Sequence, residues 1–235
     1  KLLNIEHKPR LVFSNEEVSI LYEETEEYKQ KVASMKTSNK VKTEFIPKRV
    51  LTYTFENLSR NREKGMLATE IIKICRSILN GQFSRGVYVY GPTGTGKTYL
   101  MGSIYNYFKQ NGKEPTILYY PEFIRKIKSK ISDNSYDLYI DLVRDEEILI
   151  IDDIGAENIT EFIRDEVLGP IINHREAEKL PTFFSSNLSI DDLAELLSNG
   201  RTTVDRTKAL RIVERIHSLC SLHFLDGENE REYYN

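Results

Sequence analysis

The sequence predicts an α/β domain in which a mostly parallel sheet of five strands lies between two layers of helices. Three observations support this fold class. From about residue 51, short apolar segments alternate with longer amphipathic ones, which is typical of parallel strands joined by crossover helices. A glycine-rich segment that fits G-x-x-x-x-G-K-[ST] separates one such strand from the next helix. The apolar run Ile148 to Ile151 ends in two aspartates, as in a buried strand with polar groups at its carboxyl end.

The composition is that of a globular protein with no strong overall charge. The chain has 235 residues, 40% of them hydrophobic and 29% charged, which suits one large domain or one domain with an appendage. The net charge of −3 means that any nucleic-acid site must be a local basic patch. Cys75 and Cys220 each stand alone in an apolar segment, which excludes a disulfide framework and a four-cysteine zinc site. We expect buried structural thiols.

No segment of the sequence indicates a membrane or an export signal. No apolar run is long enough to span a bilayer, and the N-terminus lacks the apolar core of a signal peptide. We therefore expect a cytoplasmic protein without a membrane partner.

Residues 1–50 differ from the rest of the chain. The segment RLVFSNEEVSILYEE predicts two short strands around a SNEE turn. The charged stretch TEEYKQKVASMKTSNKVKTEF predicts a solvated connector or a helix. Because two short strands cannot form a core alone, we assign residues 1–50 to the remnant of an N-terminal domain and its linker. Residues 51–235 form the main domain.

The first half of the main domain predicts two strand–helix pairs. Residues 86–91, GVYVYG, read as a strand because they alternate β-branched and aromatic side chains. A helix follows at 96–112 and ends in a glycine, a common helix terminator. Residues 115–120, PTILYY, form the next strand, and the helix 121–132 begins with a proline, which suits a first helical position.

The second half continues the alternation. Residues 146–153, EEILIIDD, form a strand that is buried on both faces. The segment 159–178 has helical periodicity, although Pro170 should bend or break it. Residues 180–187, LPTFFSSN, form a strand. The remaining predictions are helices at 189–198 and 207–220 and a last short strand at 222–227.

The segment GPTGTGKT predicts a phosphate-binding loop. Glycines allow backbone N–H groups to turn inward around phosphate oxygens. Lys97 would place its charge against the β- and γ-phosphates, and Thr98 would offer a hydroxyl to Mg²⁺. The N-terminus of the following helix favours the same anion. The residues expected to bind ATP are Gly91, Pro92, Thr93, Gly94, Thr95, Gly96, Lys97, Thr98 and Tyr99.

The two aspartates at the end of the strand 146–153 predict a site for Mg²⁺. Ligands of such folds bind at the carboxyl ends of the strands, where Gly91 and Asp152 can converge. Asp152 would hold the Mg²⁺ that accompanies ATP, because this hard cation prefers oxygen ligands. Asp153 points away from Asp152, because successive side chains of a strand alternate in direction. It would act on the water that attacks the γ-phosphate. The alternative is that Asp153 only caps the following turn.

These motifs together resemble those of the AAA+ ATPases, a class of P-loop NTPases with a three-layer sandwich fold. The segments GVYVYGPTGTGKTYLMGSI, VRDEEILIIDDIGAE, RDEVLGPIINHR, LPTFFSSNLS, KALRIVERI and FLDGEN resemble, in this order, the bacterial helicase loaders of the DnaC/DnaI family, in particular its DnaI branch. The resemblance covers nearly the whole chain. It implies that residues 51–235 are an AAA+ ATPase domain of a primosome component.

The resemblance implies further catalytic residues. Asn187 corresponds to the sensor that positions the attacking water, with a helix cap as the alternative. Arg215 corresponds to an arginine finger that reaches the γ-phosphate of a neighbouring subunit. Arg211, one turn earlier on the same face, is the competing candidate, and a surface salt bridge is the alternative for both. Many relatives carry Asp-Glu in place of Asp152-Asp153, so we expect slow, switch-like ATP hydrolysis.

The ends of the chain depart from the family pattern. The last predicted strand lies close to residue 235, so we expect the helical lid to be lacking, with Arg231 as a weak substitute for the arginine of that lid. Members of the DnaI branch also carry an N-terminal zinc-binding domain that contacts the replicative helicase. Its cysteines are missing from residues 1–50, so we do not carry metal binding over to this region.

The segment EFIRKIKSK predicts a DNA-binding helix. Phe123, Ile124, Ile127 and Ile131 share one helical arc, and basic residues occupy the remainder, which alone is typical of a solvated helix face. The resemblance favours a path for single-stranded DNA instead, with basic groups along phosphates and an aromatic ring as a stacking surface. The predicted DNA-binding residues are Phe123, Lys126, Lys128, Lys130, Thr160 and Phe162.

Together these expectations describe an ATP-dependent loader of the hexameric replicative DNA helicase. It binds ATP and Mg²⁺, contacts single-stranded DNA and associates with itself through the arginine-finger interface. One rival is an IstB-type transposition ATPase, which shares the same core. Another is a nucleotide-binding adaptor without significant hydrolysis, which the short Asp153 side chain favours.

Overall fold

The computed structural model describes residues 7–14, 17–30, 47–58, 62–132, 135–198 and 202–227. The chain divides into two compact units, Lys1–Val41 and Lys42–Asn235. Residues 47–50, which the sequence analysis placed in the linker, therefore fall in the second unit. Arg231 lies outside the described residues.

The first unit contains the predicted β-hairpin. Strand β1 (His7–Ser14) pairs antiparallel with β2 (Glu17–Glu24), with Ser14 opposite Glu17. An ion pair of 2.7 Å between Arg10 and Glu23 links the two strands. Residues 26–30 are helical, and the rest of the predicted connector, 31–46, lies outside the described residues.

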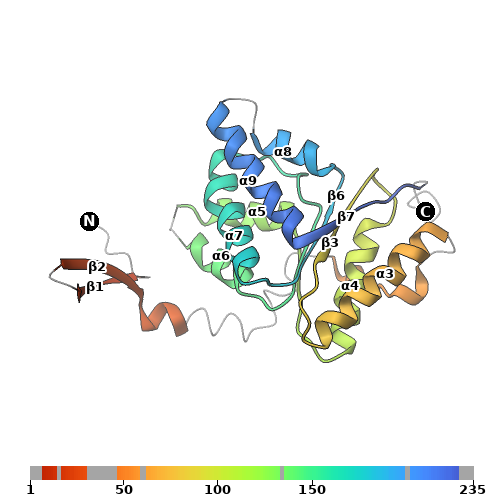
Figure 1. Cartoon of the computed structure of the whole chain (residues 1–235), viewed down its shortest axis with the longest axis horizontal. Coiled ribbons are helices and arrows are strands. Elements are labelled where there is room, and N and C mark those ends of the chain that lie inside the picture. The colour runs from red at the N-terminus through yellow and green to blue at the C-terminus, as the bar shows by residue number, and fades with distance from the viewer. Residues whose placement is uncertain are drawn as a thin grey trace. The chain divides into compact units, whose positions relative to one another are not determined.

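The second unit is built on one sheet (Figure 1). The strands follow one another in the order β4-β5-β6-β3-β7, and the four pairings are all parallel. The predicted fold class, a mostly parallel five-stranded sheet, is therefore confirmed. The strands are β3 (Gly86–Tyr90), β4 (Thr116–Tyr119), β5 (Leu149–Asp152), β6 (Thr182–Ser186) and β7 (Cys220–Phe224).

Helices α3 (Arg62–Leu79) and α4 (Lys97–Gln110) cover one face of the sheet. Alternate strand residues such as Val87, Ile150 and Phe183 join the apolar sides of these helices in one buried cluster. Two short 3₁₀ helices, η1 (Lys48–Thr52) and η2 (Phe55–Asn57), precede α3 and pack on α4. The sequence analysis predicted α4 but gave no assignment to α3.

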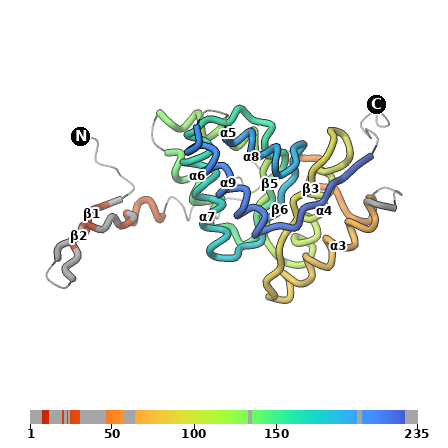
Figure 2. The backbone as a smooth tube through the Cα atoms, turned by 45° about the horizontal axis from the view of Figure 1, so that its top comes forward, coloured from red at the N-terminus to blue at the C-terminus, as the bar shows by residue number. Residues whose placement is uncertain are grey.

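The remaining helices lie on the other side of the sheet, as Figures 1 and 2 show from two directions. The strand residues of the alternate set, such as Tyr88, Ile151 and Phe184, are fully buried. The sequence analysis predicted each of these helices except α6. Their bounds are α5 (Tyr120–Ser129), α6 (Tyr136–Arg144), α7 (Gly169–Ala177), α8 (Ile190–Ser198) and α9 (Thr203–Leu219).

Pro170 does not break the predicted helix at 159–178, which the sequence analysis expected it to bend or break. Residues 161–177 stay helical, but the turn before Pro170, Ile163–Leu168, is a π-helix. Proline has no N–H group and its ring crowds the preceding turn, and a wider turn accommodates both effects. The proline then occupies one of the first positions of α7.

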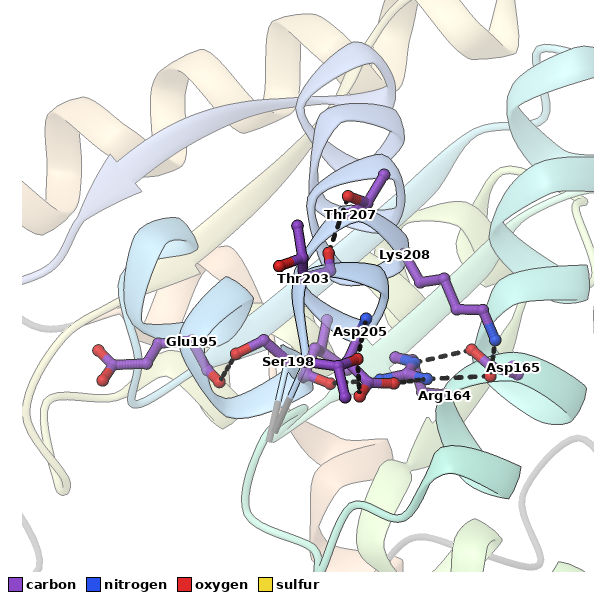
Figure 3. Close-up of polar contacts among 10 residues, drawn as sticks. Arg164, Asp165, Glu195, Ser198, Thr203, Asp205, Thr207 and Lys208 are labelled. Atoms are coloured by element: carbon purple, nitrogen blue, oxygen red, sulfur yellow. Dashed lines mark hydrogen bonds and ion pairs between the residues drawn. The ribbon is translucent and has the colours of Figure 1, made fainter. Parts of the chain in front are cut away.

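An ion cluster around the buried Arg164 connects the start of α9 to this π-helical turn (Figure 3). Arg164 is fully buried and donates to both carboxylate oxygens of Asp165, at 2.7 and 3.0 Å, and to Asp205 at 2.8 Å. Lys208 of α9 also donates to Asp165, at 2.7 Å. Two cations thus meet two carboxylates, which fixes the start of α9 relative to the segment that follows β5.

The two cysteines agree with the expectation of buried structural thiols. Cys75 and Cys220 are both buried and unpaired, and burial raises the pKa of the Cys75 thiol to about 12. Structural thiols are therefore confirmed. Within the described residues, no helix combines the length and the apolar character that crossing a membrane requires.

Candidate nucleotide-binding site

The predicted phosphate loop and the two aspartates lie at the same edge of the sheet. Gly91 directly follows β3, Asp152 is the last residue of β5, and Asn187 directly follows β6. Strand β6 lies between β5 and β3, so the carboxyl ends of these three neighbouring strands bring the groups together. This convergence is what the parallel fold predicted.

The loop Gly91–Thr98 depends on its glycines. Gly91, Gly94 and Gly96 have φ angles of 148°, 90° and 96°, which side chains disfavour. A β-carbon at Gly91 would also lie 2.2 Å from the carbonyl oxygen of Leu225, just after β7. The backbone therefore curls back on itself here and enters α4 at Lys97.

Lys97 lies across this loop. Its side chain is buried, and Nζ donates to the carbonyl oxygens of Gly91 and Pro92, each at 2.7 Å. Both acceptors are neutral carbonyl oxygens at the start of the loop. Thr95 supports the turn by donating to the same Pro92 carbonyl at 3.0 Å.

The first carboxylate is deeply buried and carries two hydroxyl donors. Thr98 donates to Oδ1 of Asp152 at 3.2 Å, and Ser185 of β6 donates to the same oxygen at 2.5 Å. Burial raises the pKa of Asp152 from 3.8 to about 6, and the two hydrogen bonds oppose this shift. Among the described residues, no hydrogen bond reaches Oδ2 of Asp152.

The second carboxylate has both oxygens engaged. Asn187 donates to Oδ1 of Asp153 at 3.1 Å, and the hydroxyl of Tyr119 donates to Oδ2 at 3.1 Å. The burial of Tyr119 and the charge of Asp153 raise the pKa of the Tyr119 hydroxyl to about 12. Asp153 also has φ of 63°, a left-handed conformation that aspartate tolerates better than most residues.

The sequence analysis missed Tyr119 and Ser185, although both touch the aspartates. Tyr119 ends β4, next to β5, and Ser185 lies on β6, on the other side of β5. Their positions at the carboxyl ends of the two strands that flank β5 were the available signal. Partners 32 to 34 residues distant cannot be paired from sequence periodicity alone.

The donor set fits ATP with Mg²⁺. The loop offers backbone N–H groups and one ammonium group, which suit phosphate. Thr98 and Asp152 offer a hydroxyl and a carboxylate that are already in contact, and such oxygen groups suit Mg²⁺. Tyr99, the residue after Thr98, stacks on Tyr53 with ring centroids 4.3 Å apart.

The two candidate arginine fingers lie on α9, away from this loop in the sequence. Arg215 is partly exposed and donates to the carbonyl oxygen of Arg211 at 3.2 Å, and Arg211 is exposed. Neither forms an ion pair with any described residue. Both guanidinium groups therefore stay available to a group outside this chain.

The structure corrects one predicted DNA contact. Phe123 is fully buried on the inner side of α5 and packs against Tyr120, with ring centroids 6.1 Å apart. Its ring cannot serve as a stacking surface for a base. The predicted apolar arc itself is present, because Ile124 and Ile127 are buried with it, whereas Ile131 lies beyond the end of α5 and is 41% exposed.

The basic residues of α5 lie on its outer side. Lys128 is exposed and donates to the carbonyl oxygen of Asn158 at 3.2 Å. The ammonium of Lys126 lies 5.6 Å from the centre of the Tyr139 ring, a cation–π distance. Lys130 caps the end of α5. These side chains are not buried in the core.

Thr160 and Phe162 lie at the start of the helix after β5. The hydroxyl of Thr160 accepts the N–H of Ile163 at 3.3 Å, so this side chain caps the helix. Phe162 is half-buried, and its ring meets that of Tyr136 edge-on at 5.3 Å. Both residues therefore have structural contacts, whatever else they bind.

Comparison with known proteins gives one consistent picture. Residues 50–205 match the model of the bacterial DnaA ATPase domain. The chain is 32% identical over 227 residues to the replicative helicase loader DnaI of Bacillus subtilis, which covers 96% of this chain and 73% of that protein. A crystal structure of DnaI matches with a TM-score of 0.69 and 31% identity, over 77% of this chain and 95% of that one.

A crystal structure of the DnaC helicase loader also has the same fold. Its TM-score is 0.64 at 19% identity, over 77% of this chain and 100% of that one.

Proposed function

We propose that this chain, which belongs to the DnaI family of bacterial replicative helicase loaders, is an ATP-dependent loader of the replicative DNA helicase. Residues 50–205 belong to the bacterial DnaA type of ATPase domain. Family membership supports a role in helicase loading for DNA replication and an ATPase-type activity. The observation that carries the finer proposal is the convergence of Lys97, Asp152 and Asp153 at one sheet edge.

Each side chain of the site has one task in this proposal. ATP supplies a transferable phosphoryl group, and Mg²⁺ neutralises part of the phosphate charge. Lys97 binds the phosphates, since its ammonium already lies across the loop. Thr98 and Asp152 hold the cation, and Asp153 with Asn187 orients a water.

The contacts of Asp153 and Asn187 argue against the alternatives considered for them. Asn187 bonds Asp153, whereas the residue that caps α8 is Ser189, whose hydroxyl accepts the N–H of Asp192 at 3.2 Å. The Asp153 carboxylate accepts no bond from the described backbone of the turn that follows it. A role toward a ligand therefore fits both side chains better than a capping role.

Replacing Asp153 with asparagine should leave ATP bound and slow its turnover. An amide cannot take a proton from the attacking water, and such assistance contributes about 10²- to 10⁴-fold. We expect the Kd for ATP to stay within about 3-fold of wild type, because Asp153 contacts neither Lys97 nor Thr98. Asp153→Glu should retain turnover, because the carboxylate remains. The measurement is ATP turnover with helicase and single-stranded DNA present.

Asp191→Asn is the matched control for this comparison. Asp191 is an exposed acidic residue in the first turn of α8, so the same charge is removed away from the site. If Asp153→Asn hydrolyses ATP as fast as wild type and the control, Asp153 is a turn residue and the proposal for it is wrong.

One structural observation favours the adaptor as a second candidate function. Both oxygens of Asp153 are engaged by Tyr119 and Asn187, so in this arrangement the carboxylate has little freedom to act on a water. A loader requires that the contact with Tyr119 opens in the assembled state. Turnover that stays absent with helicase and single-stranded DNA present would favour the adaptor.

We also propose that the outer side of α5 contacts single-stranded DNA. Replacing Lys126, Lys128 and Lys130 with alanine should weaken DNA binding and flatten its dependence on salt. Each lost phosphate contact reduces the slope of log K against log[salt] by about 0.7 for a single strand. Titration at several salt concentrations measures this slope.

A control removes the same charge from the opposite side of the sheet. Lys73 lies on α3, Lys109 lies in the last turn of α4, and Lys113 follows the end of α4. Their triple replacement should leave the slope unchanged. Equal slopes for both triple variants and wild type would return α5 to the alternative of a solvated helix face.

A further inference from the structure

Ser185 is a buried hydroxyl that touches both aspartates of the site. It lies on β6 with 1% of its surface exposed. Its Oγ donates to Oδ1 of Asp152 at 2.5 Å and accepts the backbone N–H of Asp153 at 2.9 Å. No other described side chain forms hydrogen bonds with both residues, and the sequence analysis assigned Ser185 no role.

The direction of these two bonds is fixed by their chemistry. A peptide N–H can only donate, so the N–H of Asp153 makes the Ser185 oxygen an acceptor. The hydroxyl has a single hydrogen, which is directed at Oδ1 of Asp152. Thr98 donates to the same oxygen at 3.2 Å. Two donors on Oδ1 orient the carboxylate group and leave Oδ2 as the acceptor that faces a cation.

The second bond acts on the backbone of Asp153. This residue has φ of 63°, a left-handed backbone conformation that is uncommon for residues other than glycine. The Ser185 oxygen holds the N–H of that same residue. The position of the Asp153 carboxylate between Tyr119 and Asn187 follows from this backbone geometry.

We propose that Ser185 is a positioning residue that sets the metal-holding carboxylate of Asp152 and the water-orienting carboxylate of Asp153 relative to each other. This inference rests on the proposed function as an ATP·Mg²⁺ site and deepens it. Ser185 itself touches neither nucleotide nor metal. Its effect passes through one hydrogen bond to each aspartate.

The neighbouring Ser186 provides a matched control. It is equally buried on the same strand and also forms two hydrogen bonds. Its Oγ donates to the carbonyl oxygen of Ile154 at 2.6 Å and accepts the N–H of Leu188 at 3.1 Å. Neither bond involves a carboxylate. Ser186→Ala therefore shows the effect of losing a buried hydroxyl that has only a structural role.

The experiment compares Ser185→Ala and Ser186→Ala in the full-length protein. ATP binding is titrated against Mg²⁺, and the melting temperature is recorded for both variants. We expect Ser185→Ala to raise the Mg²⁺ concentration for half-maximal binding about 10- to 100-fold, as losses of groups that orient metal ligands do. ATP binding in excess chelator should stay at the wild-type value, because the phosphate loop is intact. Ser186→Ala should lower the melting temperature without changing the Mg²⁺ requirement.

Two results would overturn the inference. One is an unchanged Mg²⁺ requirement in Ser185→Ala, and the other is an equal change in Ser186→Ala. If Ser185→Ala does not fold, Ser185→Cys replaces it, because a thiol keeps the shape and is a weaker donor and acceptor; it should give a smaller increase in the same direction, and no increase would overturn the inference. Failure of the wild-type protein to bind ATP at all would instead refute the proposed function.

Discussion

Replacing Lys97 with alanine should abolish ATP binding at concentrations that saturate the wild-type protein. The ammonium of Lys97 is buried and lies across the loop, held by the carbonyl oxygens of Gly91 and Pro92. In the complex the ammonium would pair with the phosphates of ATP. Removing one partner of a buried charge pair costs about 2–5 kcal/mol, which is roughly 30- to 5,000-fold in Kd. Calorimetric titration with ATP and Mg²⁺ measures the effect.

Lys109→Ala serves as the control on the same helix. Lys109 is exposed in the last turn of α4, about three turns from Lys97, and pairs with Glu114 at 2.6 Å. It should bind ATP as wild type does. Both variants should unfold cooperatively, since the core of α4 consists of apolar residues that neither change touches. Tight ATP binding by a folded Lys97→Ala variant would refute the phosphate loop as the nucleotide site.

Replacing Arg215 with alanine should leave ATP binding by the isolated chain unchanged and reduce ATP turnover in the assembled state. Arg215 is partly exposed on α9 and has no ion-pair partner among the described residues, as a group that acts on a neighbouring subunit requires. Arginine fingers contribute about 10³- to 10⁵-fold to turnover in well-studied nucleotide hydrolases. Turnover is measured as a function of protein concentration with helicase and DNA present.

Arg211→Ala is both the control and the competing assignment. Arg211 lies one turn before Arg215, and its carbonyl oxygen accepts the hydrogen bond from Arg215. If Arg211→Ala reduces turnover and Arg215→Ala does not, the finger is one turn earlier than proposed. If neither variant changes turnover at any protein concentration, no finger acts from this face of α9.

The parallel sheet and the phosphate loop could be predicted because their signals are local. Each strand is a short apolar run, and Gly91 to Thr98 is a continuous motif at the junction of a strand and a helix. Asp152 was placed correctly at the strand end by the same reasoning. The fold then brings these segments together without further information, because parallel strands share one carboxyl edge.

The contacts between distant segments could not be predicted in this way. Tyr119 and Ser185 reach the aspartates from the two strands that flank β5, and strand order is not written in local periodicity. Phe123, in contrast, was assigned a DNA contact that the structure excludes. Its position in one arc with Ile124 and Ile127 indicated burial, and the structure follows that periodicity rather than the expected role in base stacking.

Pro170 illustrates how tertiary context changes a local rule. Its missing N–H predicted a bend or break, but the helix continues through a π-helical turn. That turn carries Arg164, whose ion cluster with Asp165 and Asp205 holds the segment against α9. The wider turn accommodates the proline within a continuous helix, which helix propensity alone does not predict.

Helicase loading onto circular single-stranded DNA tests the central proposal most directly, because a ring cannot thread onto a circle from an end. The replicative helicase of the same organism is incubated with the circles, ATP and Mg²⁺, with full-length wild-type protein or its Lys97→Ala variant, and the helicase retained on DNA is measured. The account predicts that the wild-type protein increases retention and that the Lys97→Ala variant does not. Equal retention with the wild-type protein, with the variant and with no added protein would contradict it.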